Sequence, residues 1–447
     1  MYYDRSIHLS DHKTLRVPEP DPSLFTGKPK GSLSFATSRR EYSSMPVTAQ
    51  ASLPLATRRF PGLQQGLLSR RRVYFDNACL TPVPAEVAEA VKEYYSQPPG
   101  CPLRNNSGRS GDLEERIREA RDSVRSFLNA KFSDEIVFTP NTTFGINLLS
   151  GAFLYRPGKV LLTDLEHNSN RLPWLAHDRL ELSWPPGQPF PFDAYRRALH
   201  QNIKLVSVTA RSNVTGESPP IAELVREAII AGVPVHLDAA QAFASGELDV
   251  TESGADFVSF SLHKAYGPTG LGGLYMRREW RKRLEPTYSG AGTVDDHFGE
   301  KSEWTDGAPR FEYGLQNYAA IYAVPVAMRL LAGIPPQATR DHFAELNAFL
   351  RTELRRLPRV RLVGPGDPVD GHHVCSFYVP GADPQRLSSL LDMAGNFQVR
   401  AGRLCAHHWF HKYEVPDVIR VSFGLHNSLE EVEAYAKVFG NILRHYL

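Results

Sequence analysis

From Arg72 onward, apolar runs of strand length alternate with longer segments that have a helical period. This alternation is typical of βαβ units, in which parallel strands form one sheet and the connecting helices cover its faces. Strands are predicted at residues 135–138, 159–163, 204–209, 233–238, 257–260 and 273–276, and helices include 143–152 and 221–231. The order of these segments predicts an α/β domain built on a mainly parallel sheet.

The pattern changes after Asn317. Long helical segments come first, at about 318–331 and 340–357, and short strands follow at about 374–379, 397–400 and 418–423. Ser428 and Glu431 stand three residues apart before an apolar segment, which is the capping box that begins a last helix. We therefore expect a large domain over residues 73–317, with its first residues able to pack on the small domain, and a smaller α+β domain over 318–447.

The first 72 residues differ from the rest of the chain. They are rich in Pro, Ser, Arg and Thr and show no sustained apolar period. They lack the apolar segment of a secretory signal, and acidic residues argue against a transit peptide: Asp4, Asp11, Glu19, Asp21 and Glu41. We expect residues 1–72 to form an extension, disordered or loosely packed, that is not part of the catalytic unit.

Composition excludes several classes of partner. Of the 447 residues, 51 are Lys or Arg and 49 are Asp or Glu, so a net charge of +2 gives no field that would attract nucleic acid or a membrane surface. No apolar run is long enough to span a membrane. The chain has four scattered cysteines without CxxC spacing, which argues against a disulfide framework and a structural zinc site and favours a cytoplasmic location.

Lys264 and Asp238 form the strongest chemical signal. Lys264 ends an apolar strand and precedes a Gly/Pro-rich loop, where a desolvated amine can form a Schiff base with an aldehyde cofactor. Asp238 ends the preceding predicted strand, and ligands of open α/β sheets bind at such strand ends. A carboxylate there can hold the pyridinium nitrogen of pyridoxal phosphate, with Gln241 near the phenolic oxygen. Taken singly, Lys264 would be a surface lysine and Asp238 a helix cap.

Two further segments fit the same cofactor. Thr142 and Thr143 follow a predicted strand and begin a helix, and a helix N-terminus is a phosphate site. His167 also follows a strand and could stack on a cofactor ring. The ordinary alternatives are a simple helix cap for the threonines and a structural histidine for His167.

Eight motifs follow one another along the chain: YFDNA at 74–78, TTFGIN at 142–147, EHNSN at 166–170, SNVTG at 212–216, DAAQ at 238–241, SLHK at 261–264, RFEYG at 310–314 and RAGRLCA at 400–406. With this set the chain resembles the class V, fold-type I pyridoxal-phosphate enzymes from about Val73 to Leu447. Within that family it is most similar to the Suf-type (Csd subfamily) cysteine desulfurases and selenocysteine lyases. The resemblance implies a large domain with a mainly parallel seven-stranded sheet and a smaller α+β domain.

The resemblance also implies roles in cofactor binding. Lys264 would carry the cofactor and later move the substrate Cα proton. Asp238 would pair with the pyridine nitrogen, Gln241 with the phenolic oxygen, and His167 would stack on the ring. The phosphate would be held by hydroxyl and imidazole groups, namely those of Thr142, Thr143, Ser261 and His263. Substrate binding would fall to Asn213, Arg420 and Arg400, the first two on the substrate carboxylate.

Cys405 is the implied nucleophile, which takes sulfur as a persulfide. Basic neighbours (Arg400, Arg403, His407 and His408) favour the thiolate, and a loop after Gly402 gives access. A metal site of Cys405 with His407 and His408 lacks a further ligand pair, so no metal is expected. Cys79 and Cys375 lie in apolar, strand-like surroundings and are expected to be packed residues.

The implied activity is that of a homodimeric cysteine desulfurase, which converts L-cysteine to L-alanine and passes sulfur to an acceptor protein. Alternatives on the same scaffold are a selenocysteine lyase, a C–S lyase or an amino-acid epimerase; a binding protein that kept the fold is a further one. Three motifs depart from the family. Arg104-Asn105-Asn106-Ser107-Gly108 stand where the family has a histidine-containing segment. Arg403-Leu404 replace a pair of histidines, and Leu315-Gln316 replace a Thr-Pro pair whose threonine normally reaches a phosphate across the dimer.

Overall fold

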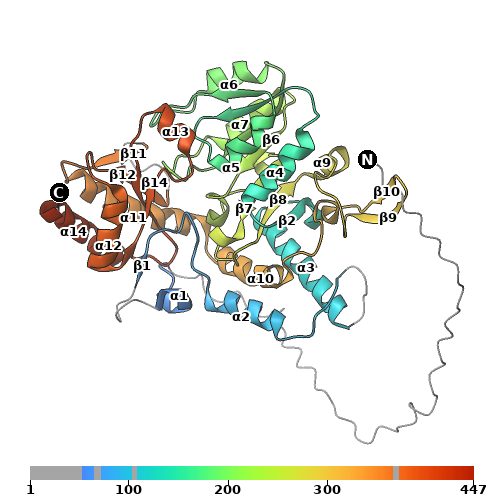
Figure 1. The fold of residues 1–447 in the computed structure, drawn as a ribbon, viewed down its shortest axis with the longest axis horizontal. Coiled ribbons are helices and arrows are strands. Elements are labelled where there is room, and N and C mark those ends of the chain that lie inside the picture. The colour runs from blue at the N-terminus through green and yellow to red at the C-terminus, as the bar shows by residue number, and fades with distance from the viewer. Residues whose placement is uncertain (1–52, 65–71, 103–107, 366–371, 447) are drawn as a thin grey trace, which may run out of the picture. The chain divides into compact units, whose positions relative to one another are not determined.

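The computed structural model describes residues 53–64, 72–102, 108–365 and 372–446. The chain divides into two units, Met1–Thr48 and Ala49–Leu447, and all described residues belong to the second (Figure 1). Its helices are α1 (Pro61–Gln64), α2 (Ala85–Tyr95), α3 (Gly108–Phe127), α4 (Thr142–Phe153), α5 (Asn168–Arg171), α6 (Phe192–Leu199), α7 (Ile221–Ile230), α8 (Val250–Ser253), α9 (Arg278–Arg283), α10 (Tyr318–Ala332), α11 (Pro336–Arg355), α12 (Pro384–Gly395), α13 (His407–Lys412) and α14 (Leu429–Tyr446).

The largest sheet has seven strands in the order β2-β8-β7-β6-β5-β3-β4. They are β2 (Ile136–Thr139), β3 (Lys159–Thr163), β4 (Arg179–Leu182), β5 (Ile203–Thr209), β6 (Val235–Asp238), β7 (Phe257–Ser261) and β8 (Gly272–Met276). Only β8 runs antiparallel to its neighbours in this sheet, so the predicted mainly parallel α/β fold is confirmed. The edge strand β4 escaped prediction because exposed and buried residues are mixed along it instead of forming an apolar run.

Both faces of this sheet are buried. Along β3, Leu161 joins one hydrophobic cluster, whereas Val160 and Leu162 join the cluster on the other face. Successive side chains of a strand point to opposite faces, so a strand covered on both sides is apolar at every position. The polar residues of the site therefore stand out at the strand ends, where the apolar runs stop.

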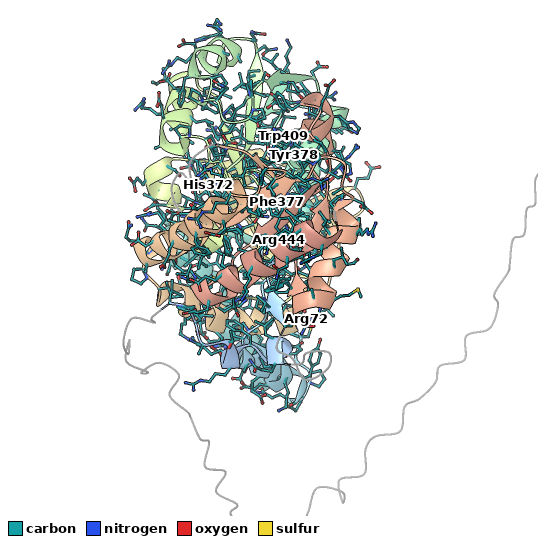
Figure 2. The ribbon with its side chains drawn as sticks, turned by 90° about the vertical axis from the view of Figure 1, so that its left-hand side faces the viewer. Arg72, His372, Phe377, Tyr378, Trp409 and Arg444 are labelled. Atoms are coloured by element: carbon teal, nitrogen blue, oxygen red, sulfur yellow. The ribbon has the colours of Figure 1, made fainter. Side chains whose placement is uncertain are left out.

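The smaller domain contains a four-stranded antiparallel sheet, β11-β12-β15-β14, packed by α11, α12 and α14. Its strands are β11 (Arg361–Val363), β12 (Val374–Tyr378), β14 (Arg400–Gly402) and β15 (Val418–Ser422). Figure 2 looks onto this domain and marks Phe377 and Tyr378 of β12 and Arg444 of α14. The predicted capping box is confirmed, since Glu431 N donates to Ser428 Oγ (3.4 Å) and Ser428 N to Glu431 Oε2 (3.3 Å).

One predicted feature of the small domain differs in the structure. The single strand expected at 397–400 is wrong, because Phe397–Gln398 (β13) pairs with Val73–Tyr74 (β1), while β14 pairs with β15. The boundary expected after Asn317 stays a prediction; on either side of it, α10 packs on α2 and α3, whereas α11 packs on α14.

The N-terminal boundary also differs from the expectation that residues 1–72 lie outside the catalytic unit. Leu55, Phe60 and Leu63 are at most 5% exposed and belong to the main hydrophobic core. Leu55 N donates to Leu425 O (2.7 Å). The apolar residues of this segment are too few and too irregularly spaced to give a period, so only long-range packing identifies them. Residues 1–52 and 65–71 lie outside the described residues.

Within the described part of the chain, no single helix has the length and apolar character needed to cross a membrane. The helices α10 and α11 reach that level only when taken together, and they meet at a bend of 75°.

Candidate active site

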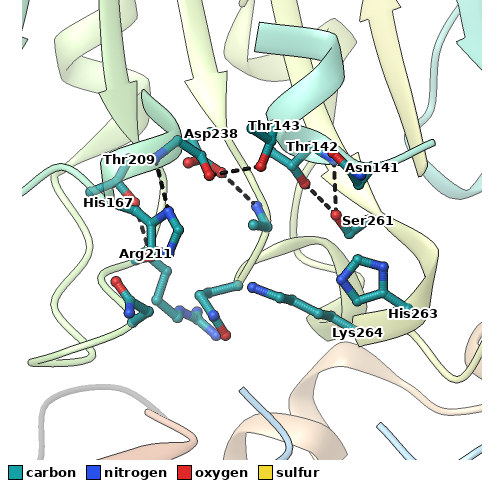
Figure 3. Close-up of a pocket in the computed structure, with 14 residues that line it drawn as sticks. Asn141, Thr142, Thr143, His167, Thr209, Arg211, Asp238, Ser261, His263 and Lys264 are labelled. Atoms are coloured by element: carbon teal, nitrogen blue, oxygen red, sulfur yellow. Dashed lines mark hydrogen bonds between the residues drawn. The ribbon is translucent and has the colours of Figure 1, made fainter. Parts of the chain in front are cut away.

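A cavity of about 250 Å³ opens at the carboxyl ends of β5, β6 and β7 (Figure 3). Most of the predicted site residues line it: Thr142, Thr143, His167, Asn213, Asp238, Gln241, Ser261, His263 and Lys264. Asn141, Ser169, Thr209, Arg211 and Ala240 line it as well. Strand ends thus bring together residues that lie more than 100 positions apart, as the sequence predicted for a parallel sheet.

Lys264 and Asp238 come from neighbouring strands. β7 continues into a short 3-10 helix, Leu262–Lys264, and Figure 3 shows the Lys264 side chain reaching into the cavity. Burial, partly offset by the negative charge of Asp238, lowers the pKa of Lys264. Such an amine is more readily neutral, which is the form that attacks a carbonyl carbon.

Asp238 is a buried carboxylate, and few neighbouring groups offset the cost of burying its negative charge. It is 3% exposed, and its Oδ1 accepts the Ala240 N–H (3.0 Å). Burial raises its pKa, although the Ala240 N–H and Lys264 act in the other direction. Asp238 makes no ion pair with any residue of the described ranges, so a protonated ring nitrogen in the cavity would supply the missing positive charge.

The other end of the cavity is built from hydroxyl groups at the start of α4. Asn141 caps this helix by accepting the Phe144 N–H (2.9 Å). Ser261 Oγ lies 2.9 Å from Thr142 N and 2.6 Å from Thr142 Oγ1, and Thr143 Oγ1 lies 2.7 Å from Ser169 Oγ. Hydroxyls and backbone N–H groups at a helix N-terminus are a suitable set of donors for a phosphate.

His167 stands as the N-cap of α5 beside Lys264. Its Nδ1 accepts the Ser169 N–H (3.1 Å), so the ring proton resides on Nε2. Burial, together with the positive charges of Lys264 and Arg420, lowers the pKa of His167 to about 3. The imidazole is therefore neutral at physiological pH and can lie against an aromatic ring without adding charge to the cavity.

Arg420 and Arg400 share one carboxylate. Arg420 Nη2 pairs with Asp76 Oδ1 and Arg400 Nη2 with Asp76 Oδ2, both at 2.9 Å. Arg420 also donates to the main-chain oxygen of Asn213 (3.1 Å), and its Nε is buried without a hydrogen-bond partner among the described residues. Arg400 Nη2 additionally contacts Cys79 Sγ (2.6 Å). The prediction that Cys79 is merely a packed residue is therefore wrong, whereas Cys375 is buried as predicted.

Cys405 is exposed on the loop that joins β14 to α13. Leu404 and Cys405 both adopt positive φ angles, +50° and +55°, a backbone conformation that is unfavourable for residues other than glycine. Two bonds hold the loop against the large domain: Asn213 Nδ2 donates to Leu404 O and Asn168 N donates to Cys405 O, both at 2.7 Å. The loop is thus fastened directly beside His167 and Asn213.

The basic neighbours of Cys405 are largely paired with other groups. Arg403 Nε binds Asp417 (3.0 Å), and His408 Nε2 lies 3.1 Å from Glu181. His407 Nδ1 contacts the Asn168 amide (2.9 Å). These side chains therefore interact with other groups, and Arg403 in particular is paired with Asp417. Within the described ranges, no three or more His, Cys, Asp or Glu side chains are grouped so as to hold a metal ion.

The family model "Aminotransferase class-V" matches residues 73–435. The chain belongs to the class V aminotransferase family. This confirms the family to which the motifs pointed, while the Suf-type subdivision stays a prediction.

Named relatives of this class V protein are cysteine desulfurases. A probable cysteine desulfurase of Chlamydia muridarum is 30% identical over 383 residues, covering 84% of this chain and 95% of that protein. The cysteine desulfurase of Cronobacter sakazakii is 31% identical over 385 residues, covering 84% and 94%. The solved apo structure of a cysteine desulfurase from Thermococcus onnurineus NA1 has a TM-score of 0.80 at 30% identity and covers 87% of this chain and 100% of that chain. This likeness confirms the predicted fold class.

Several residues of the class V site were missed from the sequence. Arg211 lines the cavity and pairs with Glu247 (2.8 Å). It directly precedes the SNVTG motif, so its position after a predicted strand was the available signal. Cys79 directly follows the YFDNA motif, and Asp76 lies within it. The pairing of Asp76 with Arg420 spans 344 residues and has no local signature.

Proposed function

We propose that the chain is a pyridoxal-phosphate-dependent cysteine desulfurase. The observation that carries this proposal is that the cavity residues and the Cys405 loop lie next to each other. A cavity with Lys264 and Asp238 at adjacent strand ends has the Cys405 loop fastened to its wall by Asn213 and Asn168. The names of the relatives support the same activity.

The described residues fit pyridoxal phosphate at three points. Lys264 provides an amine, Asp238 a buried carboxylate for the ring nitrogen, and the Thr142–Ser261 cluster provides donors for the phosphate. When bound, the cofactor stabilises negative charge at the substrate Cα and thereby weakens the bond to the side-chain sulfur. Lys264 would be the group that moves the Cα proton, because its amine lies in the cavity and burial lowers its pKa.

Arg420 is suited to the carboxylate of an amino-acid substrate. Its Nε is buried with no hydrogen-bond partner in the part of the chain that the structure describes, and the guanidinium is held in place by Asp76 and by the main-chain oxygen of Asn213. A fixed guanidinium binds a carboxylate with little loss of side-chain entropy. The Asn213 amide, which lines the cavity while donating to Leu404 O, links this carboxylate site to the Cys405 loop.

Cys405 accepts the sulfur in this proposal. Its Sγ forms a bond to the sulfur of L-cysteine while the bond from that sulfur to Cβ breaks, and Cβ takes up a proton. L-Cysteine and the Cys405 thiol thus become L-alanine and a Cys405 persulfide, with no external oxidant or reductant. The strained loop keeps Sγ at the surface, where an acceptor protein can remove the sulfur.

We further propose that the enzyme is a homodimer. The hairpin of β9 (Val294–Phe298) and β10 (Lys301–Trp304) projects from the large domain (Figure 1) and carries Phe298, which is 86% exposed. Leu315, at the position of the family's cross-dimer threonine, is 83% exposed. A second copy would cover these apolar side chains. The free state of all four cysteines supports a cytoplasmic location.

The decisive experiment is product analysis after the purified chain is incubated with pyridoxal phosphate and L-cysteine. A desulfurase releases alanine and leaves one extra sulfur atom on the Cys405 peptide, detected by mass spectrometry. The exposed Cys101 serves as the internal control and should gain none. Pyruvate and ammonia as products would indicate a C–S lyase instead, and D-cysteine would indicate an epimerase.

A further inference from the structure

His373 lies behind Gln241 as seen from the active-site cavity. A smaller cavity of about 30 Å³ adjoins the main one, and Gln241, Lys264 and Arg211 line both. His373 lines only the smaller cavity. It directly precedes β12 of the small domain, so this residue brings the small domain to the rear of the cofactor site.

The Gln241 amide has a determined orientation. Its nitrogen, Nε2, lies 2.8 Å from the main-chain oxygen of Ala78, which can only accept a hydrogen bond. The amide oxygen therefore faces the other way, where His373 Nε2 lies 3.0 Å from Oε1. An amide oxygen can only accept, so His373 must carry its proton on Nε2.

The same orientation leaves one donor for the cavity. Nε2 of Gln241 has two hydrogens, and Ala78 O takes one of them. No other residue of the described ranges accepts the second, and Gln241 lines the main cavity. Burial and the positive charges of Arg211 and Arg420 hold the pKa of His373 well below its usual range, so the ring stays neutral with a single N–H.

We propose that His373 is a positioning residue, which fixes the Gln241 amide by donating from Nε2 to Oε1 and so directs the second Gln241 N–H into the cavity. This inference rests on the proposed function, in which the phenolic oxygen of pyridoxal phosphate accepts that N–H. A donor at this oxygen stabilises its anionic form. His373 thereby sets the acidity of the bound cofactor without touching it.

The test is a pH titration of the absorbance that develops when pyridoxal phosphate is added to the full-length protein. In H373L the Gln241 amide loses the hydrogen bond from His373 that fixes its orientation. The hydrogen bond from Gln241 to the cofactor should then lose roughly half or more of its strength, which should raise the apparent pKa of the bound cofactor by about 0.5–1 unit. H373Q carries an amide nitrogen at about the place of Nε2 and should restore the wild-type titration. H372L is the matched control, since His372 is also buried but is not among the described residues that line either cavity.

Two further variants separate the possible failures. If His373 acts through Gln241, H373L should add no shift in a Q241A background; an equal shift in both backgrounds would overturn the inference. A wild-type titration of H373L would overturn it as well. Should H373L fail to fold, the comparison of the H373N and H373Q titrations decides, because asparagine places its amide nearer to Nδ1 and should not restore the titration.

Failure of the proposed function looks different: the wild type would show no absorbance band, or K264A would show the same band.

Discussion

Lys264 and Asp238 stand at the ends of neighbouring strands, whereas Cys405 stands on a loop whose own backbone is unfavourable. The sheet places the first two without further support, because parallel strands end at one edge. The loop holds two consecutive residues at positive φ, a cost of about 1–2 kcal/mol for each. It is retained by bonds from Asn213 and Asn168 of the other domain. In the proposed function, the rigid side of the site, at the strand ends, carries the cofactor chemistry, and the tethered side, the Leu404–Cys405 loop, carries the sulfur transfer.

The largest expected effect is on the rigid side. K264A should lower alanine formation from L-cysteine by more than about 1,000-fold, because the acid–base group and the cofactor link are lost together. Selenocysteine turnover should fall equally. K282A, which removes an exposed lysine of α9, is the matched control and should behave as wild type. Residual activity of K264A above one part in a thousand would remove Lys264 from its proposed role.

The corresponding change on the loop should separate the two substrates. In C405A, alanine formation from L-cysteine should fall by about 100- to 1,000-fold, since no other thiol takes its place. Turnover of selenocysteine should persist, because the weaker C–Se bond breaks without a protein nucleophile. The absorbance of the bound cofactor should be unchanged, and C101A is the control. Wild-type alanine formation by C405A would instead favour a lyase.

Stability measurements test whether the N-terminal segment, in addition to the sheet, stabilises the rigid side of the site. Phe60 is fully buried and packs between Tyr266, two residues after Lys264, and His426 of the small domain, with ring centroids 5.8 and 5.1 Å away. F60A should lower the free energy of unfolding by about 3 kcal/mol, measured by urea denaturation. R58A, at an exposed neighbour, should stay within about 0.5 kcal/mol of wild type. Equal stability of the two variants would show that this segment is not part of the core.

The smallest effect concerns the tether of the loop. N168A removes the amide contact to His407 and leaves the main-chain bond to Cys405 O in place. One neutral hydrogen bond contributes about 0.5–1.5 kcal/mol, so alkylation of Cys405 by iodoacetamide should quicken about two- to tenfold. Cys101 provides the reference rate in the same sample. An unchanged ratio of the two rates would mean that the side chain of Asn168 does not restrain the loop.

The rigid side was largely predictable from the sequence, and the tethered side only in part. Each strand of the pocket is an apolar run that stops at a polar residue, so Asp238 and Lys264 were visible locally. Cys405 was located by a motif, but neither its positive φ nor its bonds to Asn213 and Asn168 have a local signal. The charges near it were visible, whereas the pairing of Arg403 with Asp417 was not.

Contacts between distant segments account for the remaining differences. The contact of His373 with Gln241 spans 132 residues and that of Arg400 with Cys79 spans 321. In each case the sequence around either residue gives no signal of the contact, which forms only when the fold brings the two segments together. The N-terminal segment is similar, since Leu55 and Phe60 have no apolar period around them yet fill gaps between elements that lie far along the chain.

That N-terminal segment contacts elements that lie far along the chain. Leu55 is bonded to Leu425, Phe60 contacts both domains, and β1 adds a strand beside β13. Two of these contacts hold the segment on the small domain, and Phe60 also reaches Tyr266 of the large domain, close to Lys264. In the proposed function, Cys405 therefore passes its sulfur on from a loop that two hydrogen bonds hold in place, so an acceptor protein would have to reach that loop.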